Sequence, residues 1–119
     1  MPKLIHSRDG RFLGEFDLQE GTLSIGRAPD CDITLDDETV SGRHALITTR
    51  PSAYLEGLLD LLIEDLGSSN GTFVNDKRLS KRHMLKHDET VRIGGHAFTL
   101  IDEGTRALET TTIILPENP

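Results

Sequence analysis

The sequence predicts an all-β sandwich or barrel, because short alternating segments are separated by turn residues along most of the chain. Between the turns, apolar and polar residues alternate with a period of two, as in strands with one buried face. Clusters rich in Gly, Asn, Asp and Pro recur roughly every ten residues, a spacing typical of all-β folds. These clusters lie at residues 8–10, 19–21, 28–30, 36–38, 67–71, 75–77 and 94–95.

The alternation is clearest in four segments. In residues 12–18, Phe12 and Phe16 fall on one face, and Glu15 and Asp17 fall on the other. In residues 23–25, 91–93 and 98–100, one polar residue stands between two apolar residues. Each segment is therefore predicted to be a strand with one face in a core.

Residues 55–65 fit two periods. Leucines at positions 55, 58, 59 and 62 have the i, i+3, i+4, i+7 spacing of a helix, whereas positions 61, 63 and 65 alternate into a Gly-rich turn. Because β structure is predicted on both sides, we predict a strand over residues 58–65. Residues 50–57 then form a hairpin loop.

Length and composition indicate one folded domain. The chain has 119 residues, 13 Lys and Arg, 20 Asp and Glu, and a formal net charge of −7. This charge disfavours bulk attraction to nucleic acid or anionic lipid. The one cysteine fits a reducing cytosol, and we expect a cytoplasmic protein with no export signal, no membrane span and no cofactor.

The alternating pattern stops after Ile101. We predict a domain over residues 1–102 and a flexible, threonine-containing tail over residues 103–119. The tail contains the run Thr110, Thr111 and Thr112, preceded by Glu109. The three threonines are candidate phosphorylation sites.

Three short motifs follow one another within about fifty residues. The first is Gly26-Arg27, at the end of a predicted strand. The second is Ser41-Gly42-Arg43-His44, before a predicted strand. The third runs from Asp65 to Asn75, with the sequence DLGSSNGTFVN.

Together these motifs resemble the forkhead-associated (FHA) domain, a phosphothreonine-binding module, over about residues 3–101. The resemblance implies an FHA-like sandwich of about eleven strands, with the ligand site in loops at one end. It also implies a non-catalytic adaptor in Ser/Thr kinase signalling. Its partners would be Thr-phosphorylated proteins and a Ser/Thr protein kinase.

The resemblance assigns a role to each matching residue. Phosphopeptide binding is implied for Arg27, Ser41, Arg43, Ser69, Asn70 and Asn75, and structural support of the site for Gly26, His44 and Gly71. The residue types suit the ligand, because phosphothreonine carries about −1.5 to −2 charge and three acceptor oxygens. An arginine presents a planar fork of donors to such oxygens. Many relatives carry a larger polar residue at the position of Gly42, and that residue contacts the peptide. This chain has glycine there.

The sequence leaves three other functional interpretations open. An enzyme would pair Ser41 with His44 or use His83 and His87 as metal ligands, but neither pair has a matching motif. A nucleic-acid-binding protein would use the basic segment 77–87, which lacks aromatic residues for base stacking. A scaffold would share the fold without needing phosphate.

The tail offers one further partner. The residues three places after its threonines are aliphatic, Ile113, Ile114 and Leu115, and an FHA pocket could read them. Some small bacterial FHA proteins that this chain is similar to bind their own phosphorylated tail. Two interpretations of the tail stay open: a phosphorylated tail that is captured by its own domain or by a neighbouring copy, and a disordered stub of a linker to another domain.

Overall fold

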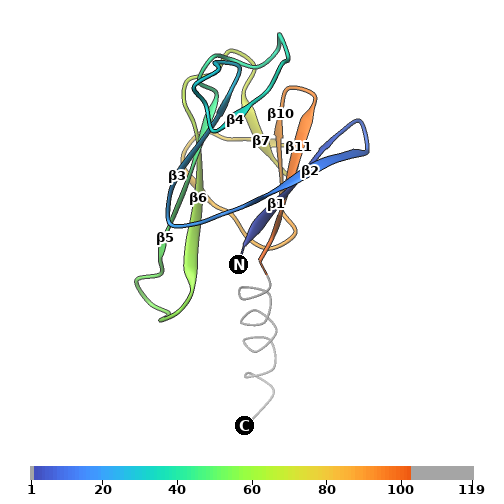
Figure 1. Cartoon of the computed structure of the whole chain (residues 1–119). Coiled ribbons are helices and arrows are strands. Elements are labelled where there is room, and N and C mark those ends of the chain that lie inside the picture. The colour runs from blue at the N-terminus through green and yellow to red at the C-terminus, as the bar shows by residue number, and fades with distance from the viewer. Residues whose placement is uncertain (1, 103–119) are drawn as a thin grey trace.

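The computed structural model describes residues 2–102, which form strands and connecting loops (Figure 1). The eleven strands are β1 (Lys3–Arg8), β2 (Arg11–Asp17), β3 (Gly21–Gly26), β4 (Ile33–Thr34), β5 (Ala45–Pro51), β6 (Leu59–Asp65), β7 (Thr72–Val74), β8 (Lys77–Arg78), β9 (His83–Met84), β10 (Thr90–Ile93) and β11 (His96–Ile101). The predicted all-β class is confirmed. No helix long and apolar enough to cross a membrane occurs in residues 2–102.

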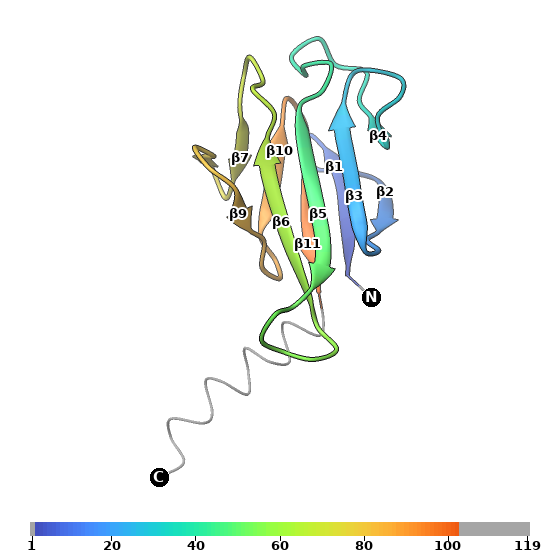
Figure 2. The same cartoon turned by 90° about the vertical axis from the view of Figure 1, so that its left-hand side faces the viewer.

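The strands form two sheets that face each other (Figure 2). One sheet has the order β2-β1-β11-β10-β7-β8, and the other has the order β4-β3-β5-β6-β9. Strand pairs are antiparallel except β3 and β4, which are parallel. Alternate side chains from both sheets fill the space between them. The buried cluster comprises Leu4, Leu18, Ile25, Ile33, Leu35, Val40, Ala45, Ile47, Leu61, Ile63, Val74, Leu85, Val91, Ile93, Phe98 and Leu100.

The prediction that Phe12 shares the buried face of β2 is wrong. The pairing of β1 with β2 shifts between His6 and Ser7, so that His6 faces Gly14 and Ser7 faces Phe12. Leu13 is the extra residue of this bulge. A bulge breaks the period of two locally, and Phe12 is left 66% exposed.

The segment 55–65, which fits both a helical and a strand period, contains the predicted strand, β6 (Leu59–Asp65). It pairs with β5 along its whole length, from Ala45 opposite Asp65 to Pro51 opposite Leu59. Strand β5 extends further than the sequence indicated, and the connecting loop covers residues 52–58. The helical spacing of the four leucines does not mark a buried face, because Leu55 is 41% exposed and only Leu62 of the four is buried.

Four loops meet at one end of the sandwich (Figure 1). They connect β3 to β4, β4 to β5, β6 to β7, and β10 to β11, and all the predicted site residues except Asn75 lie in them or at their edges. The β5–β6 hairpin, the start of β1 and the end of β11 lie at the opposite end. The two sheets thus act as a rigid support for one group of loops.

Two histidines are buried inside the six-stranded sheet. His6 Nε2 and His96 Nδ1 are 2.8 Å apart in a hydrogen bond, and the His6 ring stacks on Phe98 at a centroid distance of 4.5 Å. Burial lowers the pKa of His6, and the nearby His96 lowers it further. Burial also lowers the pKa of His96, which Arg8 reinforces and Asp37 opposes. Both rings are therefore held neutral in the fold.

This pair should make the domain sensitive to mild acid. In the unfolded chain both histidines bind protons near pH 6.5, whereas the folded domain resists protonation. The free energy of unfolding should therefore be retained above about pH 6.5 and fall as the pH decreases below it. We predict that His6→Phe flattens this fall between about pH 6.5 and pH 5, measured as the melting temperature against pH. An unchanged slope would contradict the role of the pair.

Candidate functional site

The β3–β4 and β4–β5 loops are bonded to each other through their backbones. The N–H of Arg27 donates to the carbonyl of Ser41 at 3.0 Å, and the N–H of Ala28 donates to the carbonyl of Gly42 at 3.0 Å. Gly26 makes this approach possible, since a Cβ atom there would lie 2.2 Å from the Gly42 carbonyl oxygen. The contact fixes Arg27 directly beside Ser41.

His44 connects the β4–β5 loop to the β6–β7 loop. Its ring is 0% exposed. The N–H of Ser41 donates to Nδ1 at 3.1 Å, and Nε2 lies 2.8 Å from the Gly71 carbonyl oxygen. Because Nδ1 accepts, Nε2 carries the hydrogen that is donated to Gly71. Both ring nitrogens are thus bonded to the backbones of the two loops.

The side chains of Ser41 and Asn70 add direct contacts between these two loops. Ser41 Oγ accepts a hydrogen bond from the N–H of Ser69 at 3.0 Å. Asn70 Nδ2 donates to the carbonyl oxygen of Thr39 at 2.8 Å. Arg27, Ser41, Ser69 and Asn70, predicted separately along the sequence, therefore come together at one rim of the domain.

Asp65 shapes the β6–β7 loop. Its carboxylate accepts hydrogen bonds from the hydroxyls of Ser68 and Thr72 and from the N–H groups of Gly67 and Ser68. Burial would raise the pKa of Asp65, but these hydrogen bonds outweigh burial and hold the pKa below its usual value. The loop then closes at Gly71, whose φ of +90° suits glycine.

Asp37 shapes the β4–β5 loop in the same way, a role that the sequence analysis did not assign. Its carboxylate accepts from the N–H and hydroxyl of Thr39 and from the N–H of Gly95. The Thr39 hydroxyl is the main cause that lowers the pKa of Asp37 to about 2. The spacing of Asp37 and Thr39 is that of an Asx turn, so the signal was present in the sequence. This turn positions the carbonyl to which Asn70 is bonded.

The two predicted arginines differ in their surroundings. Arg43 forms an ion pair with Asp30 and so links the β4–β5 loop to the β3–β4 loop. Arg27 is exposed, and it forms no ion pair with another residue in the described range 2–102. Its guanidinium is therefore available to a ligand without loss of an internal partner.

Asn75 is not brought to this group. It lies in the turn between β7 and β8, three residues along β7 from the loop end. Its Oδ1 accepts from the N–H of Thr90 at 3.0 Å, and its own N–H donates to the Thr90 carbonyl at 2.9 Å. With a φ of +48°, Asn75 supports a tight turn. It is thus a structural residue in this conformation.

The two histidines weighed as metal ligands have separate partners. His83 Nε2 contacts the Glu89 carboxylate at 3.1 Å, and His87 Nδ1 accepts from the N–H of Asp102 at 3.0 Å. Within residues 2–102, no three His, Cys, Asp or Glu side chains are grouped so that they could hold a metal ion.

We predict that His44→Ala lowers the free energy of unfolding by about 2–4 kcal/mol, because it leaves the part-buried N–H of Ser41 and the buried carbonyl of Gly71 without this partner. Urea unfolding measures this loss. His83→Ala is the matched control, since it removes a half-exposed histidine and should cost about 1 kcal/mol or less. Equal losses for the two variants would show that the ring does not hold the loops.

Comparison with known proteins assigns the chain to a protein family. The FHA domain model matches residues 23–94. The glycogen accumulation regulator GarA of Mycolicibacterium smegmatis is 44% identical over 79 residues, which are 66% of this chain and 45% of that protein. The oxoglutarate dehydrogenase inhibitor of Corynebacterium diphtheriae is 38% identical over 92 residues, 77% of this chain and 58% of that protein. The chain thus spans about half the length of these relatives.

Solved structures agree with the sequence matches. An FHA domain from a study of phosphothreonine-dependent FHA interactions superposes with a TM-score of 0.69 at 30% identity, covering 85% of this chain and 95% of that chain. EmbR of Mycobacterium tuberculosis, in complex with a low-affinity phosphopeptide, superposes with a TM-score of 0.68 at 34% identity, covering 84% of this chain and 24% of that chain. The prediction from the three motifs is confirmed: the chain belongs to the forkhead-associated family.

Proposed function

We propose that this domain binds phosphothreonine peptides at the rim formed by Arg27, Ser41, Ser69 and Asn70, and that it acts as a non-catalytic adaptor. The observation that carries the proposal is the exposed Arg27 beside a hydroxyl and a backbone N–H from two other loops. A phosphate group with about −1.5 to −2 charge suits this arrangement. The phosphopeptide complex of EmbR and the FHA domain studied for phosphothreonine-dependent interactions support the proposal.

Each residue has a part in the proposed complex. Arg27 offers two parallel N–H donors to phosphate oxygens, and each charge-assisted hydrogen bond contributes about 1.5–3 kcal/mol. Ser41 Oγ can donate its hydrogen to the phosphate while it accepts from the N–H of Ser69. Arg43 supplies a second positive charge, at the cost of its ion pair with Asp30. Asn75 has no contact with the phosphate in this proposal, because its side chain is bonded to Thr90 in the β7–β8 turn.

Asn70 would hold the backbone of the peptide. Its Nδ2 group is already bonded to the Thr39 carbonyl, which fixes the orientation of the amide. The amide oxygen remains able to accept a hydrogen bond from a peptide N–H. An extended peptide would therefore be held in register by Asn70 while Arg27 binds its phosphate.

The ligand would come from a Thr-phosphorylated protein, produced by a Ser/Thr kinase in the cytoplasm. The relatives GarA and EmbR, both named as regulators, support a signalling role over an enzymatic one. A scaffold that needs no phosphate would bind the same partner before and after phosphatase treatment. Phosphatase treatment should abolish binding to this domain.

The tail is a second candidate ligand. Thr110, Thr111 and Thr112 lie outside the described residues. Thr110 is nine positions after Ile101, and an extended chain of that length spans at most ~30 Å. Since β11 ends opposite the binding loops (Figure 1), this reach favours capture by a neighbouring copy. Light scattering of the phosphorylated protein over a dilution series separates the two cases, because only capture between copies raises the mass with concentration.

We predict that Arg27→Ala reduces the affinity for a phosphothreonine peptide at least ~100-fold, because two charge-assisted bonds are lost. The probe is a synthetic peptide with the sequence of residues 105–117, phosphorylated at Thr111, and calorimetry measures its affinity. Arg27→Lys should recover little of the affinity, since an ammonium group lacks the planar fork.

The matched control is Arg50→Ala, which removes an exposed arginine near the other end of β5. It should leave the affinity unchanged, and both variants should keep the melting temperature of the native protein. Wild-type affinity in Arg27→Ala would rule out the proposed phosphate site.

A further inference from the structure

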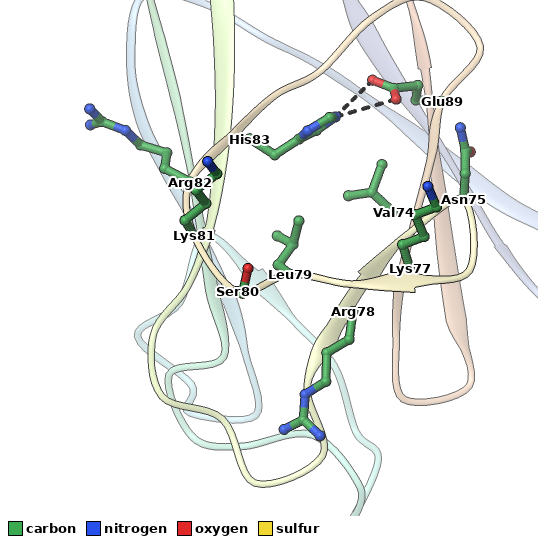
Figure 3. Close-up of a pocket in the computed structure, with 10 residues that line it drawn as sticks. All are labelled: Val74, Asn75, Lys77, Arg78, Leu79, Ser80, Lys81, Arg82, His83 and Glu89. Carbon is green, nitrogen blue, oxygen red and sulfur yellow. Dashed lines mark hydrogen bonds and ion pairs between the residues drawn. The ribbon is translucent and has the colours of Figure 1, made fainter.

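A cavity of about 400 Å³ lies beside the candidate site rather than between its loops (Figure 3). It is enclosed by the β7–β8 hairpin, the segment that follows β8, and the first residue of β9. Its lining residues are Val74, Asn75, Lys77, Arg78, Leu79, Ser80, Lys81, Arg82, His83 and Glu89. In Figure 3, Val74 and Leu79 point into the middle, so the cavity has an apolar floor.

The rim of this cavity is basic. Lys77, Arg78, Lys81 and Arg82 are all exposed, and none of them forms an ion pair with another residue of the described range 2–102. Some exposed cations of this domain do have acidic partners, as in the pairs Arg43–Asp30 and Arg92–Asp76. The rim instead brings four unpaired cations together within six residues of a chain with a net charge of −7. Their mutual repulsion favours an anionic ligand.

Two of the three acidic side chains in the walls of the two cavities, Glu89 and Asp65, are already bonded, and the third is Glu64 of the second cavity. The Glu89 carboxylate accepts from the backbone N–H of Lys86 at 2.7 Å and contacts His83 Nε2 at 3.1 Å. The Asp65 carboxylate, in the wall of the neighbouring cavity, is bonded to the β6–β7 loop. The cations are therefore open to a ligand, whereas these two carboxylates are engaged.

The basic segment continues into the candidate phosphate site. A second cavity of about 300 Å³ shares Leu79, Ser80, Lys81 and Arg82 with the first and is also lined by Gly67 of the β6–β7 loop. Arg78 lies against the same loop, since a Cβ atom at Gly71 would be 2.7 Å from Arg78 Nε. The two cavities thus adjoin along residues 79–82, and together they are called the groove; its lining residue Gly67 is two residues from Ser69.

We propose that this groove binds acidic residues that flank the phosphothreonine in the same bound peptide. The inference rests on the proposed function, because the phosphate fixes one end of the ligand at Arg27. The continuity through Gly67 and Gly71 places the groove where a bound peptide would extend, and the four cations complement Asp and Glu side chains. Val74 and Leu79 would contact the apolar parts of those side chains.

Nucleic acid is a weaker match for the same charges. The lining contains no Phe, Tyr or Trp on which a base could stack. In Figure 3, Arg78 and Arg82 point in different directions, away from the middle of the cavity, and do not form one row of cations. A single-stranded oligonucleotide is accordingly included in the test as a competing ligand.

The test compares two synthetic phosphothreonine peptides that differ only in their flanks, with Glu in one and Gln in the other at three positions on each side. At low ionic strength, the Glu peptide should bind about tenfold more tightly, since several exposed ion pairs of modest strength add together. Lys81→Glu should remove this preference, because Lys81 lines both cavities. The affinity for the Gln peptide should stay the same.

Arg50→Glu is the matched control, with the same change of charge at the end of the sandwich opposite the loops. It should keep the preference for the Glu peptide, and the melting temperatures confirm that both variants are folded. A preference that survives in Lys81→Glu would overturn the groove assignment. A second result would also overturn it: the native protein binds a thymidine oligonucleotide tightly, Lys81→Glu abolishes that binding, and the native protein shows no preference between the two peptides. Failure of both peptides to bind the native protein would instead contradict the proposed function.

Discussion

The buried ring of His44 is the interaction on which the candidate site depends. Its two nitrogens join the N–H of Ser41 to the carbonyl of Gly71, and these residues lie in loops that are separated in the sequence. Because the His44 ring holds the two loops side by side, Ser41 Oγ can accept a hydrogen bond from the N–H of Ser69. A fully buried ring with both nitrogens bonded has few alternative positions. The site is therefore preorganised, and little order needs to be created when a ligand binds.

Carboxylates shape the loops while cations are left for the ligand. Asp37 and Asp65 each accept several hydrogen bonds from their own loops, and in each case those bonds hold the pKa below its usual value. Their negative charge is satisfied locally. Arg27 has no internal ion pair among residues 2–102, and the four cations of the groove share this property. An acidic chain thus presents unpaired positive charge beside the candidate site, and the proposed preference for acidic phosphopeptides rests on this charge.

Much of this arrangement was predictable from the sequence, and the reasons for the rest are physical. Alternation and turn residues predicted the all-β class, and the three motifs predicted which residues meet. The bulge at Leu13 was not predictable, because a period of two does not reveal an inserted residue, and Phe12 was assigned to the wrong face. The separation of Asn75 from the site depends on strand pairing that is set by the whole sheet. The groove required the positions of Lys81 and Gly67, which lie far from each other in the sequence.

Mapping the bound ligand by nuclear magnetic resonance tests the central claim most directly. A ¹⁵N-labelled protein would be titrated with the phosphothreonine peptide of residues 105–117 and with its unphosphorylated form. Binding at the proposed rim predicts the largest amide shifts at residues 27–28, 41–43 and 69–71, with the phosphorylated peptide alone. Shifts confined to the opposite end of the sandwich, or equal shifts with both peptides, would contradict a phosphate site at Arg27.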